Sequence, residues 1–376
     1  MEHQSHPLLS PVPGTERRIE SFHFGPADAE RSLYVQASLH ADELPGMLVA
    51  WKLKQRFEAL EAEGRLRARV TLVPVANPNG LDQQLMDTPL GRYDFESVSN
   101  FNRRFVDVFE TIAAGLESDA GTVLSDEPQA NCREIRRRFR QALEALTPRS
   151  AFESTHLVLQ RLACEADYVL DLHCDFNAVE HLYTTPAAWP TFEPFARYFG
   201  SKASLLATDS GGASFDECFT LVWERLRQHF GDRYPIPYGS ESITVELRGQ
   251  QDVYHPLADR DAQAIIDWMT HAGLIEGQAP ALPALPYPAT PLEAMDFVHA
   301  PIGGLLVFAV EPGTLVDAGD LIAEVIDPLT DRVAEVRAPQ AGMLYARSQR
   351  RMATAGMIVA DIAGHQRHRS GYLLAP

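Results

Sequence analysis

Lysine, cysteine and long apolar runs are all scarce in this sequence. Only three lysines occur, Lys52, Lys54 and Lys202, which leaves 30 arginines among the 33 basic residues. The four cysteines stand far apart without a C-x-x-C pair, which argues against a cysteine-bound zinc and against a disulfide framework. No apolar run approaches the roughly 18–20 residues of a membrane span, and the N-terminus lacks the basic start and apolar core of a secretory signal. We therefore expect a soluble, reduced, cytoplasmic protein.

Acidic residues outnumber basic ones. The 51 Asp and Glu residues against 33 Lys and Arg give a formal net charge of −18 over 376 residues. A negative charge of this size disfavours binding to nucleic acids and to anionic membrane surfaces. It does not exclude a small anionic substrate, because a few arginines can line a pocket inside an acidic protein.

A proline-rich segment divides the chain. Residues 279–291 read APALPALPYPATP and contain five prolines, which prevents a helix or a central strand and favours an extended spacer. We predict a large domain over residues 1–278, a linker over residues 279–291 and a small domain over residues 292–376.

Strand-like and helix-like segments alternate in the large domain. Strands are predicted at residues 31–39, 69–75, 168–173 and 242–247, and a helix at residues 44–60. Two capping boxes, Ser150 with Glu153 and Ser214 with Glu217, predict further helix starts. The alternation predicts an α/β fold with a mostly parallel sheet.

Residues 131–146 (NCREIRRRFRQALEAL) form a predicted basic amphipathic helix. Its arginines could bind phosphate groups. A solvated face whose arginines pair with nearby acids is the commoner meaning of such a pattern.

The small domain contains a weak internal repeat. Residues 299–325 and 337–362 share an A-P-x-x-G motif, an apolar stretch, and a glycine before a short apolar strand. Short strands with regular glycines and no helix predict a compact β-sandwich or barrel.

The pattern resembles a lipoyl/biotinyl module, which suggests a swinging-arm carrier. A carrier needs a modifiable lysine at the hairpin tip, predicted at residues 326–332, but no lysine follows Lys202. We therefore expect a structural module that shapes access to a site or mediates assembly.

The segment SLHADELPG places His40 and Glu43 three residues apart, directly after a predicted strand. An imidazole nitrogen and a carboxylate oxygen that converge at a turn suit Zn²⁺. The H-x-x-E spacing alone is weak, because it arises by chance in many proteins.

A second histidine, His173, ends the predicted strand YVLDLH. The carboxyl ends of strands are where open α/β sheets bind ligands, although a single histidine there is more often satisfied by its neighbours. Asp171 points to the same face two residues earlier. It can accept the far N–H of a ligating histidine, or it can cap a neighbouring loop.

Glu246 lies in the strand SITVEL among apolar and β-branched residues. A buried glutamate is costly unless it is paired or used. Near an activated water it would act as a general base. The alternative is an edge-strand glutamate that faces solvent.

Between these segments, GRYDF and NFNRRF supply Arg92, Asn102 and Arg103. They offer a set of donors suited to a carboxylate and to a developing oxyanion. Arginines spaced this closely are more often surface charge.

Taken together, the order H-x-x-E, N-P-x-G, N-R-x-F, D-L-H and V-E-L resembles the succinylglutamate desuccinylase/aspartoacylase family of the zinc carboxypeptidase-like group. The resemblance extends over essentially the whole chain. It implies a mixed, mostly parallel sheet with helices on both faces, followed by a small C-terminal all-β, barrel-sandwich-like domain. This sequence departs from the family where Arg248 follows Leu247, because the glutamate strand often continues L-G.

The resemblance also implies roles for individual residues. His40, Glu43 and His173 match the ligands of a Zn²⁺ cofactor, and Glu246 matches the catalytic glutamate. In the same way, Asn102 and Arg103 match the pair that holds the substrate carboxylate, and Arg92 is the candidate for polarising the scissile carbonyl.

The resulting hypothesis is a zinc-dependent hydrolase that cleaves the amide bond of a small-molecule N-acyl amino acid. N-acetylated diamino acids and N-acyl acidic amino acids both remain candidates. The alternatives are a zinc carboxypeptidase acting on short peptides and a metal-binding pseudoenzyme. The sequence leaves open whether the chain forms a homo-oligomer.

Overall fold

A computed structural model describes residues 1–374, including the side chains of all of them except residues 120–122. The helices are α1 (Pro45–Ala62), α2 (Pro78–Leu81), α3 (Phe109–Val123), α4 (Pro128–Glu144), α5 (Ala151–Ala163), α6 (Trp189–Phe199), α7 (Glu217–Phe230) and α8 (His255–His271), with a 3-10 turn η1 (Leu292–Ala294). None of the helices in this range is long and apolar enough to cross a membrane.

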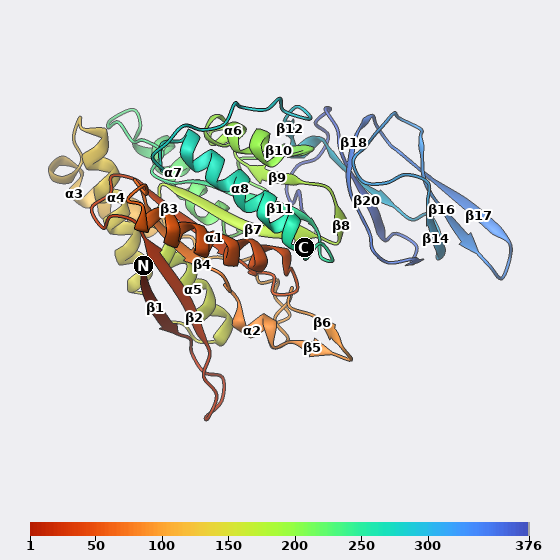
Figure 1. Cartoon of the computed structure of the whole chain (residues 1–376), viewed down its shortest axis with the longest axis horizontal. Coiled ribbons are helices and arrows are strands. Elements are labelled where there is room, and N and C mark those ends of the chain that lie inside the picture. Colours follow the sequence, from red (N-terminus) through yellow and green to blue (C-terminus); the bar gives the residue numbers. More distant parts are fainter. Residues whose placement is uncertain (375–376) are drawn as a thin grey trace.

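A nine-stranded sheet forms the centre of the larger part of the molecule (Figure 1). Its strands, in spatial order, are β1 (Glu2–Pro7), β2 (Arg18–Phe24), β4 (Arg69–Val73), β3 (Ser32–Ala37), β7 (Tyr168–Asp175), β11 (Glu241–Gly249), β9 (His181–Thr184), β10 (Ala203–Leu206) and β12 (Thr290–Pro291). The neighbours β4, β3, β7 and β11 are parallel, whereas β1, β2 and β9 introduce antiparallel pairs. A short hairpin of β5 (Gln84–Leu85) and β6 (Thr88–Pro89) lies apart from this sheet.

Side-chain alternation gives this sheet two different faces. In β7, Leu170 and Leu172 pack with α1, α6 and α8 in one apolar core. Asp171 and His173 point to the opposite face, where α3, α4, α5 and α7 form a second core. Helices therefore cover both faces, and the polar side chains of the strands collect on one of them.

The strands after η1 form two antiparallel sheets that enclose an apolar core of their own. They are β13 (Met295–His299), β14 (Gly304–Phe308), β15 (Thr314–Val316), β16 (Leu321–Asp327), β17 (Arg332–Arg337), β18 (Gly342–Arg347), β19 (Met352–Ala353) and β20 (Ile358–Ala363). The fold class predicted from the sequence, a mixed, mostly parallel α/β sheet with a C-terminal all-β part, is confirmed.

The A-P-x-x-G repeat has a structural cause. The glycine that ends each A-P-x-x-G motif, Gly304 or Gly342, begins a strand, β14 or β18. A Cβ at either glycine would lie 2.3 Å from a backbone oxygen of the neighbouring strand, that of Ile326 or Ala363. Only glycine permits these two close approaches. Figure 1 shows the hairpin of β16 and β17 at the end of the molecule opposite to α3.

The proline-rich segment does not stay separate from the main sheet. Its last two residues form β12, which pairs with the edge strand β10. A second connection comes from β8 (Asn177–Ala178), which follows β7 and pairs with β18. Leu205 of β10 packs with Met295 and Tyr345 in a shared apolar cluster. The C-terminal sheets are thus attached next to the carboxyl ends of β7 and β10.

The predicted helix start at Ser150 is correct, although the Glu153 side chain accepts from the backbone N–H of Arg149 and not from that of Ser150. The predicted start at Ser214 is wrong. Ser150 caps α5 and accepts a hydrogen bond from the backbone N–H of Glu153. Ser214 does not cap α7, because that helix begins at Glu217 with Asp216 in the cap position. Ser214 instead donates from its hydroxyl to Asp216.

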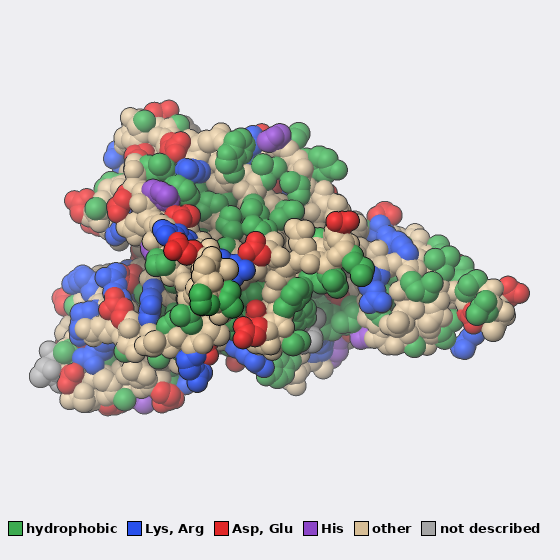
Figure 2. All heavy atoms as spheres, turned by 90° about the horizontal axis from the view of Figure 1, so that it is seen from below, with side chains coloured by type: hydrophobic (Ala, Val, Ile, Leu, Met, Phe, Trp, Pro, Cys, Tyr) green, Lys and Arg blue, Asp and Glu red, His purple; other side chains and the backbone are tan. Residues whose placement is uncertain are grey.

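The arginines of the basic helix α4 pair with nearby acids, as expected for a solvated face. Arg137 and Arg138 both pair with Glu134, and Arg136 pairs with Asp167. On the face seen in Figure 2, acidic and basic side chains are interspersed, so the net charge does not gather there in one patch.

Candidate active site

His40, Glu43 and His173 meet at the carboxyl ends of β3 and β7. One ligand atom from each lies within 4.8 Å of the others, and all three side chains are buried. The backbone turns at this point, because the N–H of Glu43 donates to the carbonyl of His40 at 3.1 Å. Gly91 packs so closely beneath this turn that a Cβ would lie 2.7 Å from Ala41 Cβ. The spacing of three residues therefore brings both side chains of the motif into one cluster.

Each histidine is held by a hydrogen bond at the nitrogen that faces away from the cluster. Asn100 Oδ1 lies 2.7 Å from His40 Nε2, and Asp171 Oδ2 lies 2.9 Å from His173 Nε2. Asp171 is itself fixed, because Gln36 Nε2 donates to its other oxygen at 2.9 Å. Acceptors at Nε2 place the proton there, so that Nδ1 of each ring can present its lone pair to a metal.

Both Nδ1 atoms face the same carboxylate. His40 Nδ1 lies 2.9 Å from Glu43 Oε1, and His173 Nδ1 lies 2.8 Å from Glu43 Oε2. Two imidazole nitrogens and a carboxylate, with their outer nitrogens already satisfied, are a donor set that fits a divalent cation such as Zn²⁺. The residues present therefore fit the implied metal.

The charges around Glu43 favour a positive charge at this point. Although burial opposes ionisation, His40 and His173 hold the pKa of Glu43 well below its ordinary value. Burial also opposes a charged His173, but Asp171 and Glu43 raise the pKa of this ring well above normal. Burial and then Arg92 lower the pKa of His40 to about 4. A metal ion can supply the positive charge in place of a proton.

Glu246 lies beside this cluster on β11. In the parallel register of the sheet it pairs with His173 of β7. Its Oε2 atom is buried and has no hydrogen-bond partner within residues 1–374. Burial and the neighbouring Glu43 raise the pKa of Glu246 well above its ordinary value. A carboxylate in this state can take up a proton readily.

Arg92 approaches the cluster from the loop after β6. Its Nη1 donates to Glu43 Oε1 at 2.9 Å, and its guanidinium lies 5.7 Å from the centre of the Phe176 ring. The side chain is about a quarter exposed, at 28 %. A guanidinium held at the edge of a pocket can donate to an oxygen that gains negative charge.

Asn102 and Arg103 line the same pocket. Their loop is bound to residues 210–217, because Asn102 Oδ1 accepts from the backbone N–H of Phe215 at 2.9 Å. Gly212 leaves room for Arg103, since a Cβ there would lie 2.7 Å from Arg103 Cδ. The loop thus holds an arginine and an asparagine at one wall of the pocket.

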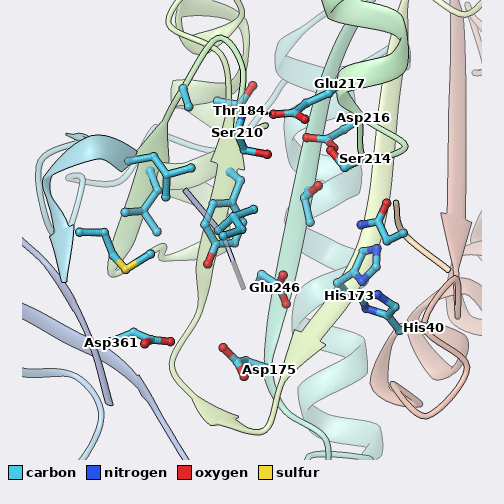
Figure 3. Close-up of a pocket in the computed structure, with 18 of the residues that line it drawn as sticks. His40, His173, Asp175, Thr184, Ser210, Ser214, Asp216, Glu217, Glu246 and Asp361 are labelled. Carbon is cyan, nitrogen blue, oxygen red and sulfur yellow. Dashed lines mark hydrogen bonds between the residues drawn. The ribbon is translucent and has the colours of Figure 1, made fainter. Parts of the chain in front are cut away.

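All seven residues singled out in the sequence line one pocket, together with residues that sequence analysis missed. Figure 3 shows Glu246 between two groups of acidic side chains, Asp216 with Glu217 and Asp175 with Asp361. Six lining residues come from the chain after the proline-rich segment, namely Leu292, Met295, Phe297, Tyr345, Asp361 and Leu374. No local motif marks these six, because they reach the pocket only through the docking of the C-terminal sheets.

Four of the eight non-glycine residues with positive φ in the described chain lie close in sequence to residues of the pocket. Their φ angles lie between 50° and 65°, and each is within two residues of a residue that lines the pocket; they are Ser38, Arg104, Ala213 and Arg248. Non-glycine residues rarely adopt this conformation, and they concentrate at functional sites, where it costs about 1–3 kcal/mol.

Comparisons with known proteins identify the family and the fold of the chain. The model of the "Succinylglutamate desuccinylase/Aspartoacylase catalytic domain" matches residues 29–272. A putative succinylglutamate desuccinylase/aspartoacylase from Shewanella frigidimarina NCIMB 400 superposes with a TM-score of 0.85, at 22 % identity, over 96 % of this chain and 97 % of its own.

Two further solved structures share the fold. A putative family protein from Shewanella amazonensis SB2B gives a TM-score of 0.82 at 23 % identity, over 96 % of this chain and 98 % of its own. The ectoine utilization protein EutE (DoeB) from Ruegeria pomeroyi, in a product-bound structure, gives a TM-score of 0.67 at 16 % identity, over 97 % of this chain and 95 % of its own. No curated protein sequence matches the chain. The family model covers well over half of the sequence, and the chain belongs to the succinylglutamate desuccinylase/aspartoacylase family.

Proposed function

We propose that this protein is a zinc-dependent hydrolase that cleaves the amide bond of a small N-acyl amino acid. The proposal is carried by one observation: the donor set of His40, Glu43 and His173 and the unpartnered carboxylate of Glu246 face one pocket. Membership of a family whose named members are desuccinylases and aspartoacylases supports the same reaction type.

His40, Glu43 and His173 would hold the metal. When bound there, zinc supplies Lewis-acid chemistry, which lowers the pKa of a water toward ~7 and polarises a carbonyl. Asn100 and Asp171 keep the two imidazole rings oriented through their Nε2 atoms. The chain therefore provides both the ligands and the partners that fix them.

Glu246 would move the proton. Its carboxylate takes a proton from the attacking water and later gives it to the leaving nitrogen. The C–O bond to the water oxygen forms first, and the C–N bond breaks afterwards as the nitrogen takes the proton from Glu246, so that an N-acyl amino acid and water become a carboxylic acid and an amine. The raised pKa of Glu246, caused by burial and by Glu43, suits a group that must first accept and then donate.

The arginines would stabilise and orient the substrate. Arg92 turns its guanidinium from Glu43 toward the carbonyl oxygen as negative charge develops there. Arg103 and the amide of Asn102 bind the carboxylate of the amino acid.

The C-terminal sheets favour a small substrate over a peptide. Tyr345 and Asp361 stand on strands β18 and β20 and form part of the pocket wall. We propose that the residues after the proline-rich linker serve as this wall. A wall at this position limits the length of chain that can extend past the reacting bond.

A substrate comparison tests the proposal. Purified zinc-loaded protein is offered a panel of N-acyl amino acids and a matched panel of dipeptides and tripeptides. We expect hydrolysis of at least one N-acyl amino acid with a kcat/KM well above that for any peptide. Faster cleavage of peptides would make the protein a carboxypeptidase. No hydrolysis of either panel would make it a metal-binding pseudoenzyme.

A further inference from the structure

Carboxylates outnumber cationic side chains in the pocket. Its lining includes Glu43, Asp175, Asp216, Glu217, Glu246 and Asp361, but only two arginines, Arg92 and Arg103. Arg92 is already paired with Glu43. Burial raises the pKa of Glu246 and of Asp361 well above their ordinary values. Even so, a lining with six acids and two arginines has more carboxyl groups than the two guanidinium groups and one divalent ion can pair. Such a pocket repels a substrate that carries several carboxylates and attracts one that carries a positive charge.

One of these carboxylates is buried and incompletely bonded. Glu217 is 6 % exposed, and its Oε1 accepts a hydrogen bond from the backbone N–H of Ser210. Its Oε2 is buried and has no hydrogen-bond partner within residues 1–374. Asp216 precedes it and lines the same pocket. The start of α7 favours negative charge at this position, but it provides no hydrogen-bond donor to Oε2.

Neither acid makes a close ion pair with a basic side chain, although the charges of both act on the pKa of the nearby Arg103. Within the described part of the chain, Asp216 and Glu217 form no ion pair with lysine, arginine or histidine. Burial and the charge of Asp216 raise the pKa of Glu217 to about 7, as expected for a buried acid beside a second acid. A bound ammonium group would satisfy Oε2 and remove this repulsion.

The two acids lie next to the loop proposed to bind a carboxylate. The backbone N–H of Phe215 donates to Asn102 Oδ1 at 2.9 Å. The backbone N–H groups of Arg104 and Phe105 donate to the carbonyls of Gly212 and Ala213 at 3.3 Å and 3.1 Å. These three hydrogen bonds hold the loop of Asn102 and Arg103 against the segment that ends at Asp216 and Glu217. An anion-binding group and a cation-binding group are thereby placed side by side.

We propose that the substrate is a diamino acid acylated on only one of its amines, with its carboxylate bound by Arg103 and Asn102 and its free ammonium bound by Asp216 and Glu217. This inference rests on the proposed amide hydrolysis. It selects the diamino acids from the candidate substrates and excludes the N-acyl acidic amino acids.

Five-carbon substrates of matched shape test the inference. The zinc-loaded full-length protein is assayed with Nα-acetylornithine, Nδ-acetylornithine, N-acetylnorvaline and N-acetylglutamate, and with the corresponding four-carbon and six-carbon sets. We expect one mono-acetyl diamino acid to have a kcat/KM about tenfold to a hundredfold above its neutral analogue, because hydrogen bonds between charged partners are stronger than neutral ones. A preference for the acidic or the neutral analogue would overturn the inference and leave the proposed hydrolysis intact.

A substitution of Glu217 tests whether this residue causes the preference for the diamino acid. Glu217→Gln keeps an oxygen that can accept from Ser210 but removes the charge. We expect it to bring the ratio of kcat/KM between the diamino acid and its neutral analogue close to one, mainly through KM. Glu144→Gln, an exposed position on α4, is the matched control and should leave this ratio unchanged. An unchanged ratio in Glu217→Gln would contradict the assignment.

Absence of all hydrolysis would be a failure of the proposed function, and binding would then decide the inference. Isothermal titration calorimetry compares ornithine with norvaline on the same protein. Tighter binding of ornithine that is lost in Glu217→Gln would support the ammonium site. Equal binding of the two, or no binding of either, would overturn it.

Discussion

Glu246 and His173 occupy paired positions on the neighbouring parallel strands β11 and β7. In-register residues of adjacent strands point to the same face of a sheet, so the carboxylate stands beside an imidazole of the candidate ligand set. The sheet itself, rather than a loop, sets this spacing. A site built on regular strands is held more precisely than one built on loops.

The first prediction concerns Glu246. We expect Glu246→Gln to lower kcat by about 10²–10⁴-fold, the usual contribution of a general base, while the zinc content stays the same. The matched control is Glu241→Gln, five residues earlier on the same strand, which should retain activity. Steady-state kinetics and metal analysis of both variants make the test. Near-normal turnover in Glu246→Gln would remove this residue from the mechanism.

A second prediction concerns the hydrogen bond that orients His173. Asp171→Asn keeps the shape of the side chain but removes its charge, so His173 Nε2 loses a strong acceptor. We expect zinc affinity to fall about 10–100-fold, while the fold is preserved because Gln36 can rotate its amide to suit the new partner. Competition with a chromophoric chelator measures the affinity. Unchanged affinity would mean that Asp171 only supports the strand.

The third prediction concerns Gly212. A methyl group there would collide with Cδ and Nε of Arg103, which lie 2.7 and 2.8 Å from the added Cβ. We expect Gly212→Ala to raise KM by roughly tenfold or more through misplacement of Arg103, with a smaller change in kcat. Gly303→Ala is the control, because its nearest neighbour atom lies at an ordinary 3.6 Å. A fall in kcat at constant KM would argue against a role of Arg103 in substrate binding.

The fourth prediction concerns stability and pH. The pKa of Glu217 is about 7 in the folded protein, raised by burial and then by Asp216, against 4.5 for the free side chain. The folded state therefore holds this proton more tightly, and ionisation of Glu217 destabilises it as the pH rises through 7. Asp216 and Asp209 add to this effect, whereas the nearby Arg103 opposes it.

Thermal unfolding checks this expectation. Glu217→Gln should raise the melting temperature at pH 8, and the gain should shrink as the pH falls toward 5. The exposed Glu144→Gln should show little change at either pH. A Glu217→Gln variant that is less stable at pH 8 would indicate that the carboxylate is a structural cap. A gain in stability with a loss of diamino acid preference would be typical of a binding residue.

The sheet and the positions of the candidate ligands on it could be predicted because they follow from local patterns. Alternation in YVLDLH places Asp171 and His173 on the face opposite Leu170 and Leu172, and the structure agrees. The helix cap at Ser150 also depends only on neighbouring residues, and it is present as predicted.

Glu217 shows why other parts could not be predicted. Ser214 and Glu217 have the spacing of a capping box, but α7 begins at Glu217. The backbone N–H of Phe215 is bound by Asn102, which lies more than a hundred residues earlier in the chain. A contact of this kind decides where the helix starts, and no local pattern reports it.

Arg248 illustrates a departure that only the structure explains. It stands at φ 65°, a conformation that glycine adopts more readily, where the family often has L-G. Its guanidinium forms two hydrogen bonds to Asp261, at 3.0 and 2.6 Å. The buried ion pair keeps the strand end in place despite the missing glycine.

The most direct test of the account is the zinc dependence of amide hydrolysis. The rate with the best N-acyl amino acid is measured for protein as purified, after removal of metal by a chelator, and after titration with zinc. The account predicts that activity is lost on removal and returns in proportion to added zinc, up to about one ion per chain. Full activity in the metal-free protein would contradict it.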